Sequence, residues 1–483
     1  MNNTRGQAST SWQARPIKVL QAILAHGHLL AVVMAVPCLV AVVEREWLLS
    51  LSLAAPTALC TVSALISTRF GAPEDLREVE AVSTLGALFV LLSLLPIPAL
   101  MVLGMEFNDA MFEAVSGVTS TGLTVAQNTM EWPFAGHVLR GWLQWTGGFA
   151  VAVAGVALLL GPGSAASAMG SVGIDDRDIL RSTRTQARDL LIVYAVITAV
   201  AILALVLLLP SWQEGIAVAL AAVSTGGFTP RADSLASYSA TAQVVTILIC
   251  LSTAVSLIAY VYLRSRDWRG ALQHSEIASF TAFVFAGLVC VGLVMTLTGT
   301  SSWDAIRDAM LNFLSGLSTA GFSTAPIAQE SGYLALVLVA MVIGGGVGST
   351  AGGIKFDRVK TLAAMVRLTL LRLRIPPRAV TSLRDGRNKV PIDRIISIAA
   401  VVFCYAVSAL LFWMAFLLSG EPPLASLFEI ISALSTVGLS SGLTGPEMQT
   451  HLKYVLVVAM LLGRLEFLAL LLALSPGTWI KRS

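Results

Sequence analysis

Charged residues are scarce in this chain. Asp, Glu, Lys and Arg together make up 12% of its 483 residues, whereas hydrophobic residues make up 56% and the mean hydropathy is +0.80. Soluble globular proteins carry about 25% charged residues, so this composition excludes an ordinary soluble protein. The formal net charge is only +3 and the basic residues lie in short loops, which argues against a nucleic-acid partner.

Residues that build metal sites and active sites are also few. The five cysteines fall in apolar stretches without metal-ligand spacing, and the five histidines form no ligand or triad pattern. The chain has no Walker loop, so we expect no nucleotide site in it, and any ATP hydrolysis would belong to another subunit. A membrane enzyme is therefore the least favoured class of function.

Long apolar stretches are abundant instead. A helix needs about 20 apolar residues to cross a bilayer, so these stretches predict an all-α polytopic membrane protein with ten crossings. They lie near residues 17–43, 47–67, 81–103, 137–161, 187–209, 241–263, 278–298, 332–370, 391–418 and 451–474.

A hydroxyl-rich hexapeptide occurs four times between the later stretches. Each copy has two hydroxyl residues, a variable residue, an invariant glycine, Leu or Phe, and a hydroxyl residue, and the glycines are 105, 94 and 117 residues apart. A short apolar segment leads into each copy and ends within it. These segments lie near 110–121, 213–226, 304–320 and 424–437. These segments are too short to span, so they predict re-entrant pore helices. The first four residues of the copies are Thr119, Ser120, Thr121, Gly122; Ser224, Thr225, Gly226, Gly227; Ser318, Thr319, Ala320, Gly321; and Ser435, Thr436, Val437, Gly438.

This repeat predicts a cation pore carried on one chain. Non-helical backbone at membrane depth is tolerated where it lines a water-filled path, and rings of backbone carbonyls can replace the hydration shell of a cation. Glycine can take a positive φ and turn its carbonyl toward an axis. A single copy could equally reflect close helix packing, but four aligned copies favour filter loops. The expected units are an N-terminal transmembrane hairpin (1–70) and four pseudo-repeats of helix, pore helix, filter loop and helix around a central pore (71–163, 164–266, 267–374 and 375–483).

Glu113 and Glu429 occupy the same place in the first and last pore-helix segments. Intramembrane carboxylates usually need partners. These two either brace the filter or attract cations, or they simply bond to nearby backbone amides.

The distribution of Lys and Arg predicts the orientation. In a ten-crossing scheme 24 basic residues fall on one side, and only Arg45, Arg140, Arg231, Arg307 and Lys453 fall on the other. We therefore expect both termini to be cytoplasmic and the filter loops to open outward. The dense basic segment 358–394 either satisfies this rule or docks an acidic cytosolic protein.

A glycine-rich run interrupts the stretch 332–370, which is too long for one straight crossing. Each glycine costs a helix roughly 1 kcal/mol relative to alanine, so the helix should break there. Lys355 ends the run, and either reaches the cytoplasmic interface or helps to hold the run in place. The residues singled out are Gly344, Gly345, Gly346, Gly348, Ser349, Thr350, Gly352, Gly353 and Lys355.

Arg464 lies in the middle of the last apolar stretch. A guanidinium near the bilayer centre carries a penalty of at least about 2.5 kcal/mol, so it should face water or a partner. Glu466 is two residues away and points elsewhere on a helix, which makes it a poor local partner. Arg464 is either an electrostatic barrier that restrains ion leak or one member of a structural ion pair.

These motifs resemble the Trk/Ktr/HKT superfamily of potassium transporters, most closely its TrkH branch. The resemblance covers essentially the whole chain. It rests on the four hexapeptides, on Gln144-Trp145 followed by Gly147-Gly148, on the glycine-rich run, and on Gly463-Arg464-Leu465-Glu466. The extra N-terminal hairpin is typical of the TrkH branch.

The resemblance implies a function and partners. It implies that the glycine-rich run is an intramembrane gating loop beneath the filter, with Arg464 beside it in the cavity. It implies K⁺ as the transported ion, since a serine in place of the first filter glycine is associated with sodium-preferring members and Gly122 is a glycine. It further implies a homodimer in the cell (inner) membrane, resting on TrkA-like cytosolic nucleotide-binding regulatory subunits.

Two other mechanisms stay open. A secondary transporter that couples K⁺ to H⁺ or Na⁺ would need alternating access, usually built from inverted repeats, whereas the repeats here run parallel. The chain could also be the translocating subunit of an ATP-driven potassium pump, with hydrolysis on another subunit.

Overall fold

The structure of the chain, a computed structural model, describes residues 13–71, 76–168, 176–269, 277–300, 302–327, 332–376, 383–385 and 388–479. Within these ranges the regular elements are helices, apart from two-residue strands β1 (Arg384–Asp385) and β2 (Asn388–Lys389), which pair antiparallel. The all-α class expected from the sequence is confirmed at this level. Five of the basic residues on which the expected orientation rests lie outside the described residues: Arg5, Arg378, Arg387, Lys481 and Arg482.

Several helices are long and apolar enough to cross a membrane, so the chain is an integral membrane protein. Among the described residues there are six such segments, or seven if the bent pair α10 (Ala240–Ala254) and α11 (Leu257–Arg264) is counted as one. With the bent pair counted, three of the ten expected crossings are not among these segments. One is 137–161, which lies in α7 (Phe134–Ala168), and the other two are 332–370 and 451–474, whose helices are interrupted. The six segments are Pro16–Val43 (α1, Pro16–Ala25, with α2, Gly27–Val43), Trp47–Phe70 (α3), Val79–Val102 (α4, Glu78–Leu94, with α5, Ile97–Val102), Thr185–Leu208 (within α8, Asp176–Leu208), Ile277–Leu297 (α13) and Ile392–Leu418 (α17).

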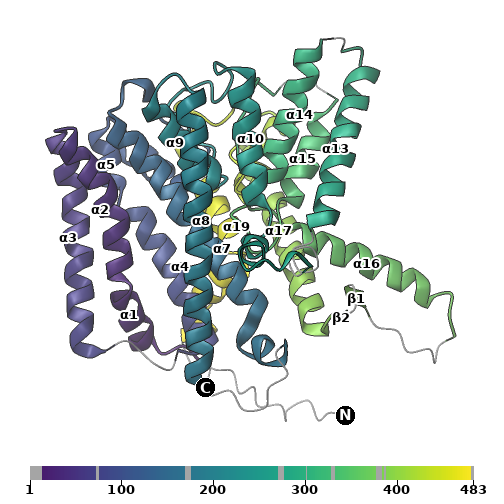
Figure 1. Cartoon of the computed structure of the whole chain (residues 1–483), viewed down its shortest axis with the longest axis horizontal. Helices are drawn as coiled ribbons and strands as arrows, with labels where there is room; N and C mark the ends of the chain where they lie inside the picture. Colours follow the sequence, from purple (N-terminus) through teal and green to yellow (C-terminus); the bar gives the residue numbers. More distant parts are fainter. Residues whose placement is uncertain are drawn as a thin grey trace.

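The four short apolar segments form short helices that are buried along most of their length. They are α6 (Phe107–Val118), α9 (Trp212–Val223), α14 (Trp303–Ser318) and α18 (Pro423–Leu434). The hydroxyl of Ser211 caps α9 by accepting from the Glu214 amide, and Ser302 caps α14 in the same way. The labels of α9 and α14 lie in the upper half of Figure 1, whereas α1, α16 and the β hairpin lie toward the lower end.

The glycine-rich run breaks its helix as expected. Helix α15 (Leu334–Ile343) ends at Gly344, whose φ of 68° is left-handed, and α16 (Phe356–Arg372) begins after Lys355. Helix α16 then runs outward from the bundle, near the β hairpin (Figure 1). The segment 344–355 between the two helices is called the glycine loop below.

The expected crossing over 241–263 is formed by two helices rather than one. Helices α10 and α11 are bent by 84° relative to each other. The carbonyl of Ala254 accepts from the amide of Gly346, and the amide of Leu257 donates to the carbonyl of Gly348. The glycine loop thus takes hydrogen bonds that a continuous helix would make with itself, and the helix ends where the loop docks.

A continuous helix over 451–474 was also the wrong expectation. Helix α19 (Thr450–Arg464) stops, and α20 (Leu468–Leu474) begins after Glu466 and Phe467, both with positive φ (55° and 58°). Glu466 forms an ion pair with Arg358 on α16. The chain ends in the described part with α21 (Pro476–Trp479), and the 3₁₀ turn η1 (Thr129–Glu131) precedes α7.

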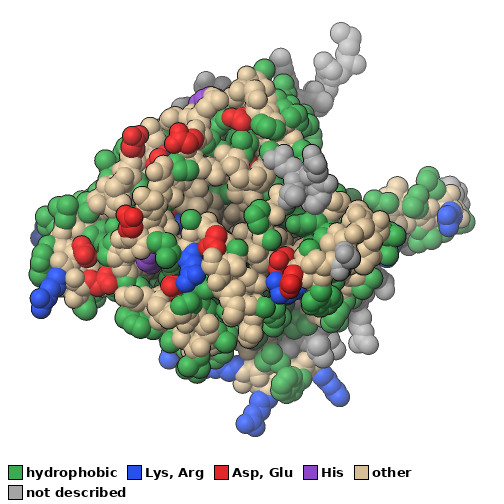
Figure 2. Space-filling model, turned by 90° about the horizontal axis from the view of Figure 1, so that it is seen from above, with side chains coloured by type: hydrophobic (Ala, Val, Ile, Leu, Met, Phe, Trp, Pro, Cys, Tyr) green, Lys and Arg blue, Asp and Glu red, His purple; other side chains and the backbone are tan. Residues whose placement is uncertain are grey.

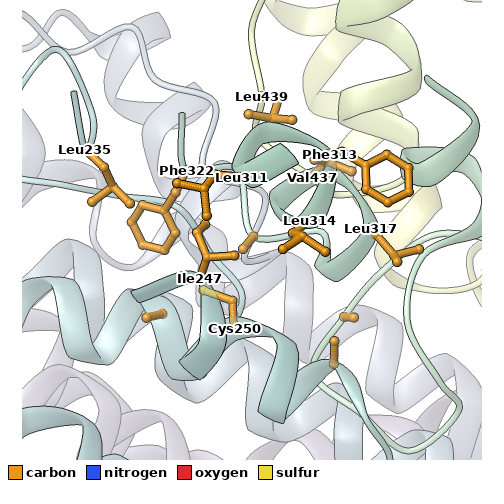
Figure 3. Packing of buried hydrophobic residues seen from close by; sticks show 14 of the residues in the cluster. Leu235, Ile247, Cys250, Leu311, Phe313, Leu314, Leu317, Phe322, Val437 and Leu439 are labelled. Atoms are coloured by element: carbon orange, nitrogen blue, oxygen red, sulfur yellow. The ribbon is translucent and has the colours of Figure 1, made fainter. Parts of the chain in front are cut away.

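The largest hydrophobic core lies around the hexapeptides and joins α8, α9, α10, α14 and α15. Its side chains come from consecutive repeats, so the short helices are held between longer ones rather than against lipid alone. Figure 3 shows part of it: Ile247 and Cys250 from α10, Leu311, Phe313, Leu314 and Leu317 from α14, and Phe322, Val437 and Leu439 from the hexapeptides, with Leu235 at one side.

Candidate functional site

All four short helices end in the same way. In the first, the amide of Thr121 donates to the carbonyl of Ser116 (2.9 Å) and the amide of Ser120 to that of Gly117 (2.9 Å), which is a Schellman ending. The other three copies repeat both bonds. The left-handed position is usually glycine, but here it is a hydroxyl residue each time: Ser120 (φ 52°), Thr225 (52°), Thr319 (54°) and Thr436 (48°).

A non-glycine residue in left-handed backbone costs about 1–2 kcal/mol, and four copies of one strained conformation indicate a shared constraint. The invariant glycine two residues later is also left-handed in every copy, as the sequence predicted. The φ values are 92° at Gly122, 82° at Gly227, 71° at Gly321 and 91° at Gly438.

The four hexapeptides touch one another in a closed ring. Each invariant glycine lies so close to the next hexapeptide that an added Cβ would overlap a backbone carbonyl oxygen there. The last copy returns to the first, so no hexapeptide is left at an edge. The contacts join Gly122 to the carbonyl of Gly226, Gly227 to that of Ala320, Gly321 to that of Val437 and Gly438 to that of Thr121.

Glu113 and Glu429 bind the last residue of their own hexapeptide and the residues just after it. Glu113 accepts from the Thr124 hydroxyl (3.0 Å) and the Val125 amide (3.3 Å), and forms a buried ion pair with Arg140 (2.8 Å). The two carboxylates therefore hold the chain where it leaves the hexapeptide, and of the two Glu113 also forms an ion pair. Glu429 accepts from the hydroxyls of Ser440, Ser441 and Thr444 and from the Ser441 amide.

The glycine loop lies against three of the hexapeptides. The Gly352 amide donates to the Thr319 hydroxyl (2.7 Å), and the Gly353 amide to the Ser435 carbonyl (3.0 Å). The Thr225 hydroxyl donates to that of Thr350 (3.3 Å). The loop therefore packs against the ring formed by the hexapeptides, through the residues at which the short helices end.

Lys355 lies within the protein rather than at an interface. Its side chain is buried, and its Nζ donates to the Ala351 carbonyl of the same loop. Of the two roles left open by the sequence, this contact fits the one in which Lys355 holds the loop.

Arg464 connects the remaining hexapeptide to the loop. Its guanidinium donates to the Thr350 carbonyl (3.0 Å), the Ser120 hydroxyl (3.3 Å) and the Gly147 carbonyl (3.3 Å), and the residue is 4% exposed. In the described part of the chain no carboxylate forms an ion pair with it, and Glu466 pairs with Arg358 instead. The contacts thus place an unneutralised positive charge between ring and loop.

Glycines in the longer helices allow this close packing. A Cβ on Gly147 would overlap the carbonyl of Val118 at the end of α6, and one on Gly463 would overlap that of Leu434 at the end of α18. The two glycines, noted in the sequence as parts of family motifs, therefore hold α7 and α19 against equivalent helix ends.

On the face shown in Figure 2, charged side chains lie among polar and hydrophobic ones around a hollow. Glu214 pairs with Arg231 (2.9 Å), whose guanidinium lies 4.4 Å from the Tyr238 ring centre, and Lys453 pairs with Asp109 (2.6 Å). Burial opposes ionisation of Glu214, but hydrogen bonds from Arg231 and Tyr238 outweigh it and hold its pKa below the usual 4.5.

Some residues of the site were not identified as such from the sequence. Ser116 and Ser432 accept from the amides of the invariant glycines in their own repeats (3.0 Å each). The Tyr405 hydroxyl contacts that of Ser435 (2.7 Å). The two serines share a place in the aligned pore-helix segments, which is a signal the sequence does carry, whereas Tyr405 comes from α17 and leaves no such trace.

Comparisons with known proteins agree with this architecture. The Trk system potassium uptake protein TrkH of Halomonas elongata is 32% identical over 395 residues, which cover 77% of this chain and 80% of that protein. The Trk system potassium uptake protein TrkI of the same organism is 26% identical over 499 residues, covering 99% and 100%. The crystal structure of the potassium transporter TrkH from Vibrio parahaemolyticus matches with a TM-score of 0.84 over 96% of this chain and all of that one, at 23% identity, and so supports the fold.

The family model described as TrkH, cation transport protein, matches residues 87–266 and 277–479. This match takes in the four hexapeptides, the glycine loop and Arg464. The chain belongs to the TrkH family of cation transport proteins.

Proposed function

We propose that this chain takes up potassium through a channel-like pore whose selectivity filter is the ring of four hexapeptides. The observation that carries the proposal is the closed ring itself, in which every invariant glycine abuts a carbonyl of the next copy. Rings of backbone carbonyls can replace the hydration shell of a cation. The pore would be lined by four pseudo-repeats with the boundaries given above, within a ten-crossing topology.

Potassium is the proposed ion, because the curated relatives reported above are named as potassium uptake proteins. Glycine at all four invariant places, including Gly122, is in keeping with K⁺ over Na⁺ within the superfamily the chain resembles. The proposed ligands are the carbonyl and hydroxyl oxygens of the four residues that begin each hexapeptide.

The glycine loop and Arg464 form the proposed gate. The loop lies against three hexapeptides, and Arg464 reaches the fourth, so an ion leaving the ring would meet the loop backbone and a positive charge. A fixed positive charge repels a cation in a low-dielectric path. The loop must therefore move, or the charge must withdraw, before ions pass.

The proposed setting follows the family. The termini would be cytoplasmic, the chain would form a homodimer in the cell (inner) membrane, and a TrkA-like cytosolic subunit would control the gate. The exposed end of α16, which leaves the bundle and carries Arg367 and Arg372, offers a cytosolic element through which such a subunit could act on the loop.

Ion flux through the purified chain in liposomes tests the proposal. We expect downhill flux that is selective for K⁺ over Na⁺ and is lost in Gly321→Asp, since any side chain there meets the Val437 carbonyl. The matched control is Gly299→Ala, another left-handed glycine with open space around it, which should transport like the wild type.

The outcomes separate the mechanisms. Unselective flux, or flux that survives Gly321→Asp, would refute the filter. Flux that requires a proton or sodium gradient would favour the secondary transporter. No flux until a cytosolic partner is added would favour obligatory control by that partner, with or without its ATP hydrolysis.

A further inference from the structure

The second hexapeptide lacks an internal brace that the other three share. Nine residues before the invariant glycine the repeats carry Glu113, Val218, Asn312 and Glu429, and only Val218 is apolar. Each polar residue of this set accepts from the amide three residues after the glycine: Glu113 from Val125, Asn312 from Thr324 (3.0 Å) and Glu429 from Ser441.

In the second repeat that amide does not exist. The residue three places after Gly227 is Pro230, which has no N–H to donate. The place six residues before the glycine, where Ser116 and Ser432 accept from the invariant glycine amide, is Ala221 in this repeat. The second pore helix therefore offers its own hexapeptide neither brace.

A side chain from another repeat occupies the gap. Gln144 on α7 donates through Nε2 to the Gly226 carbonyl and accepts through Oε1 from the Phe228 amide (3.3 Å). This pairing also fixes the orientation of the amide, because the backbone N–H needs an acceptor and the carbonyl needs a donor. Gln144 is fully buried, so both bonds are shielded from bulk solvent.

The sequence of the second hexapeptide is matched to this side chain. A Cβ on Gly226 would overlap the Gln144 amide group. The equivalent residues of the other copies are Thr121, Ala320 and Val437, all with side chains. Glycine at the variable place therefore occurs in the copy against which Gln144 packs.

One turn earlier on α7, Arg140 contacts the same hexapeptide. It donates to the Thr229 carbonyl (3.2 Å), and its guanidinium lies 4.0 Å from the centre of the Phe228 ring. Arg140 is in turn paired with Glu113 of the first repeat. The second hexapeptide is thus held by side chains of repeat one.

We propose that Gln144 is a positioning residue for ion selectivity, which substitutes across repeats for the braces that Val218, Ala221 and Pro230 do not provide. This inference rests on the proposed function, since it takes the hexapeptide ring as the filter. The Gly226 carbonyl is the atom that meets Gly122 in the ring. Gln144 therefore sets the position of the Gly226 carbonyl, where the first and second hexapeptides meet.

The test measures the ratio of K⁺ to Na⁺ flux in liposomes for the full chain. Gln144→Leu keeps the bulk but removes both bonds, and should lower the ratio about tenfold, which corresponds to about 1.4 kcal/mol. Gln243→Leu is the matched control, because Gln243 is a buried amide on α10 that donates to the carbonyls of Leu235 and Tyr238 outside the hexapeptides. It should leave the ratio unchanged.

A rescue distinguishes positioning from general damage. Adding Val218→Asn and Pro230→Ala to Gln144→Leu supplies the acceptor and the amide seen in the third repeat, and should recover at least part of the ratio. If Gln144→Leu does not fold, the double variant Gln144→Ala with Gly226→Ala carries the test, because the added methyl group fills space that the glutamine leaves, and it too should show the lowered ratio.

An unchanged ratio in the folded Gln144 variant, an equal fall in Gln243→Leu, or no recovery in the rescue would overturn the inference. The proposed function fails separately, if wild-type flux is not K⁺-selective or survives Gly321→Asp. A selective wild type that is blocked by Gly321→Asp but is indifferent to Gln144 would refute only the positioning role.

Discussion

Two glycines four residues apart allow the effect of left-handed backbone to be measured separately from the effect of the contact across the ring. Gly438 and Gly442 have almost the same φ, 91° and 92°. Alanine in left-handed backbone costs about 1–2 kcal/mol, so the variants Gly438→Ala and Gly442→Ala should lose a similar amount of stability from this cause. Their surroundings differ: a Cβ on Gly442 meets nothing within 4 Å, whereas one on Gly438 overlaps the Thr121 carbonyl.

That overlap must be relieved by moving the ring. The added Cβ would lie 2.0 Å from the Thr121 carbonyl oxygen. Non-bonded carbon and oxygen atoms settle at about 3.3–3.6 Å, so the two atoms must move apart by roughly 1.3–1.6 Å in Gly438→Ala. We expect a fall of at least about tenfold in the ratio of K⁺ to Na⁺ flux, equivalent to about 1.4 kcal/mol, or loss of flux. Gly442→Ala should keep the wild-type ratio.

Flux of both ions into liposomes, together with the melting temperature of each variant, is the assay. Equal melting temperatures with different ion ratios would support the reasoning. Gly438→Ala with wild-type selectivity would refute it, as would loss of selectivity in both variants, because the contact across the ring would then not be the cause.

Three further predictions rest on single contacts. Arg464→Ala should raise K⁺ flux several-fold, because it removes the charge between ring and loop without leaving a carboxylate unpaired; unchanged or lower flux from an equal amount of folded protein would contradict this. Glu113→Gln should lower the free energy of unfolding by about 3–5 kcal/mol, because it leaves Arg140 buried without its counter-charge. Glu429 has hydroxyl and amide partners, so Glu429→Gln should lower it by only about 1–2 kcal/mol. Equal losses in chemical unfolding would contradict the different roles of the two carboxylates. The folded-state pKa of Glu214 is lowered, so its stabilising effect is complete above its ordinary pKa of 4.5 and is lost as the pH falls through the lowered value. The melting temperatures of the wild type and Glu214→Gln should therefore converge toward low pH. A constant difference between them would show that this carboxylate does not titrate as inferred.

Local features were predictable from the sequence because their causes are local. The left-handed glycines and the break at the glycine loop follow from residue types that prefer those conformations. The ends of the short helices were within a few residues of the expected segments, since each end coincides with a hydroxyl-rich hexapeptide. The alignment of the four repeats also predicted that Glu113 and Glu429 occupy the same place, and both carboxylates bind the chain where it leaves their own hexapeptide.

Features made by contacts between repeats were not predictable in this way. The bend between α10 and α11 contains neither Gly nor Pro, and exists because the glycine loop bonds to the carbonyls at the end of α10. The interruption after α19 likewise places Glu466 against Arg358, a residue 108 positions away. Gln144 could be noted as part of a motif, but its partners Gly226 and Phe228 belong to the next repeat and only the folded chain brings them together.

The circular order of the hexapeptides has a consequence for biogenesis. Three of the four junctions join neighbouring repeats and can form as the chain is inserted, but the contact between Gly438 and Thr121 joins the last repeat to the first. A nascent chain that lacks its final segment would therefore hold three strained loops with one side open, and their polar backbone would have no partner there. Closure must wait for nearly the whole chain to be synthesised, so truncation after the third repeat should leave an assembly that inserts but is recognised as unfinished by membrane quality control.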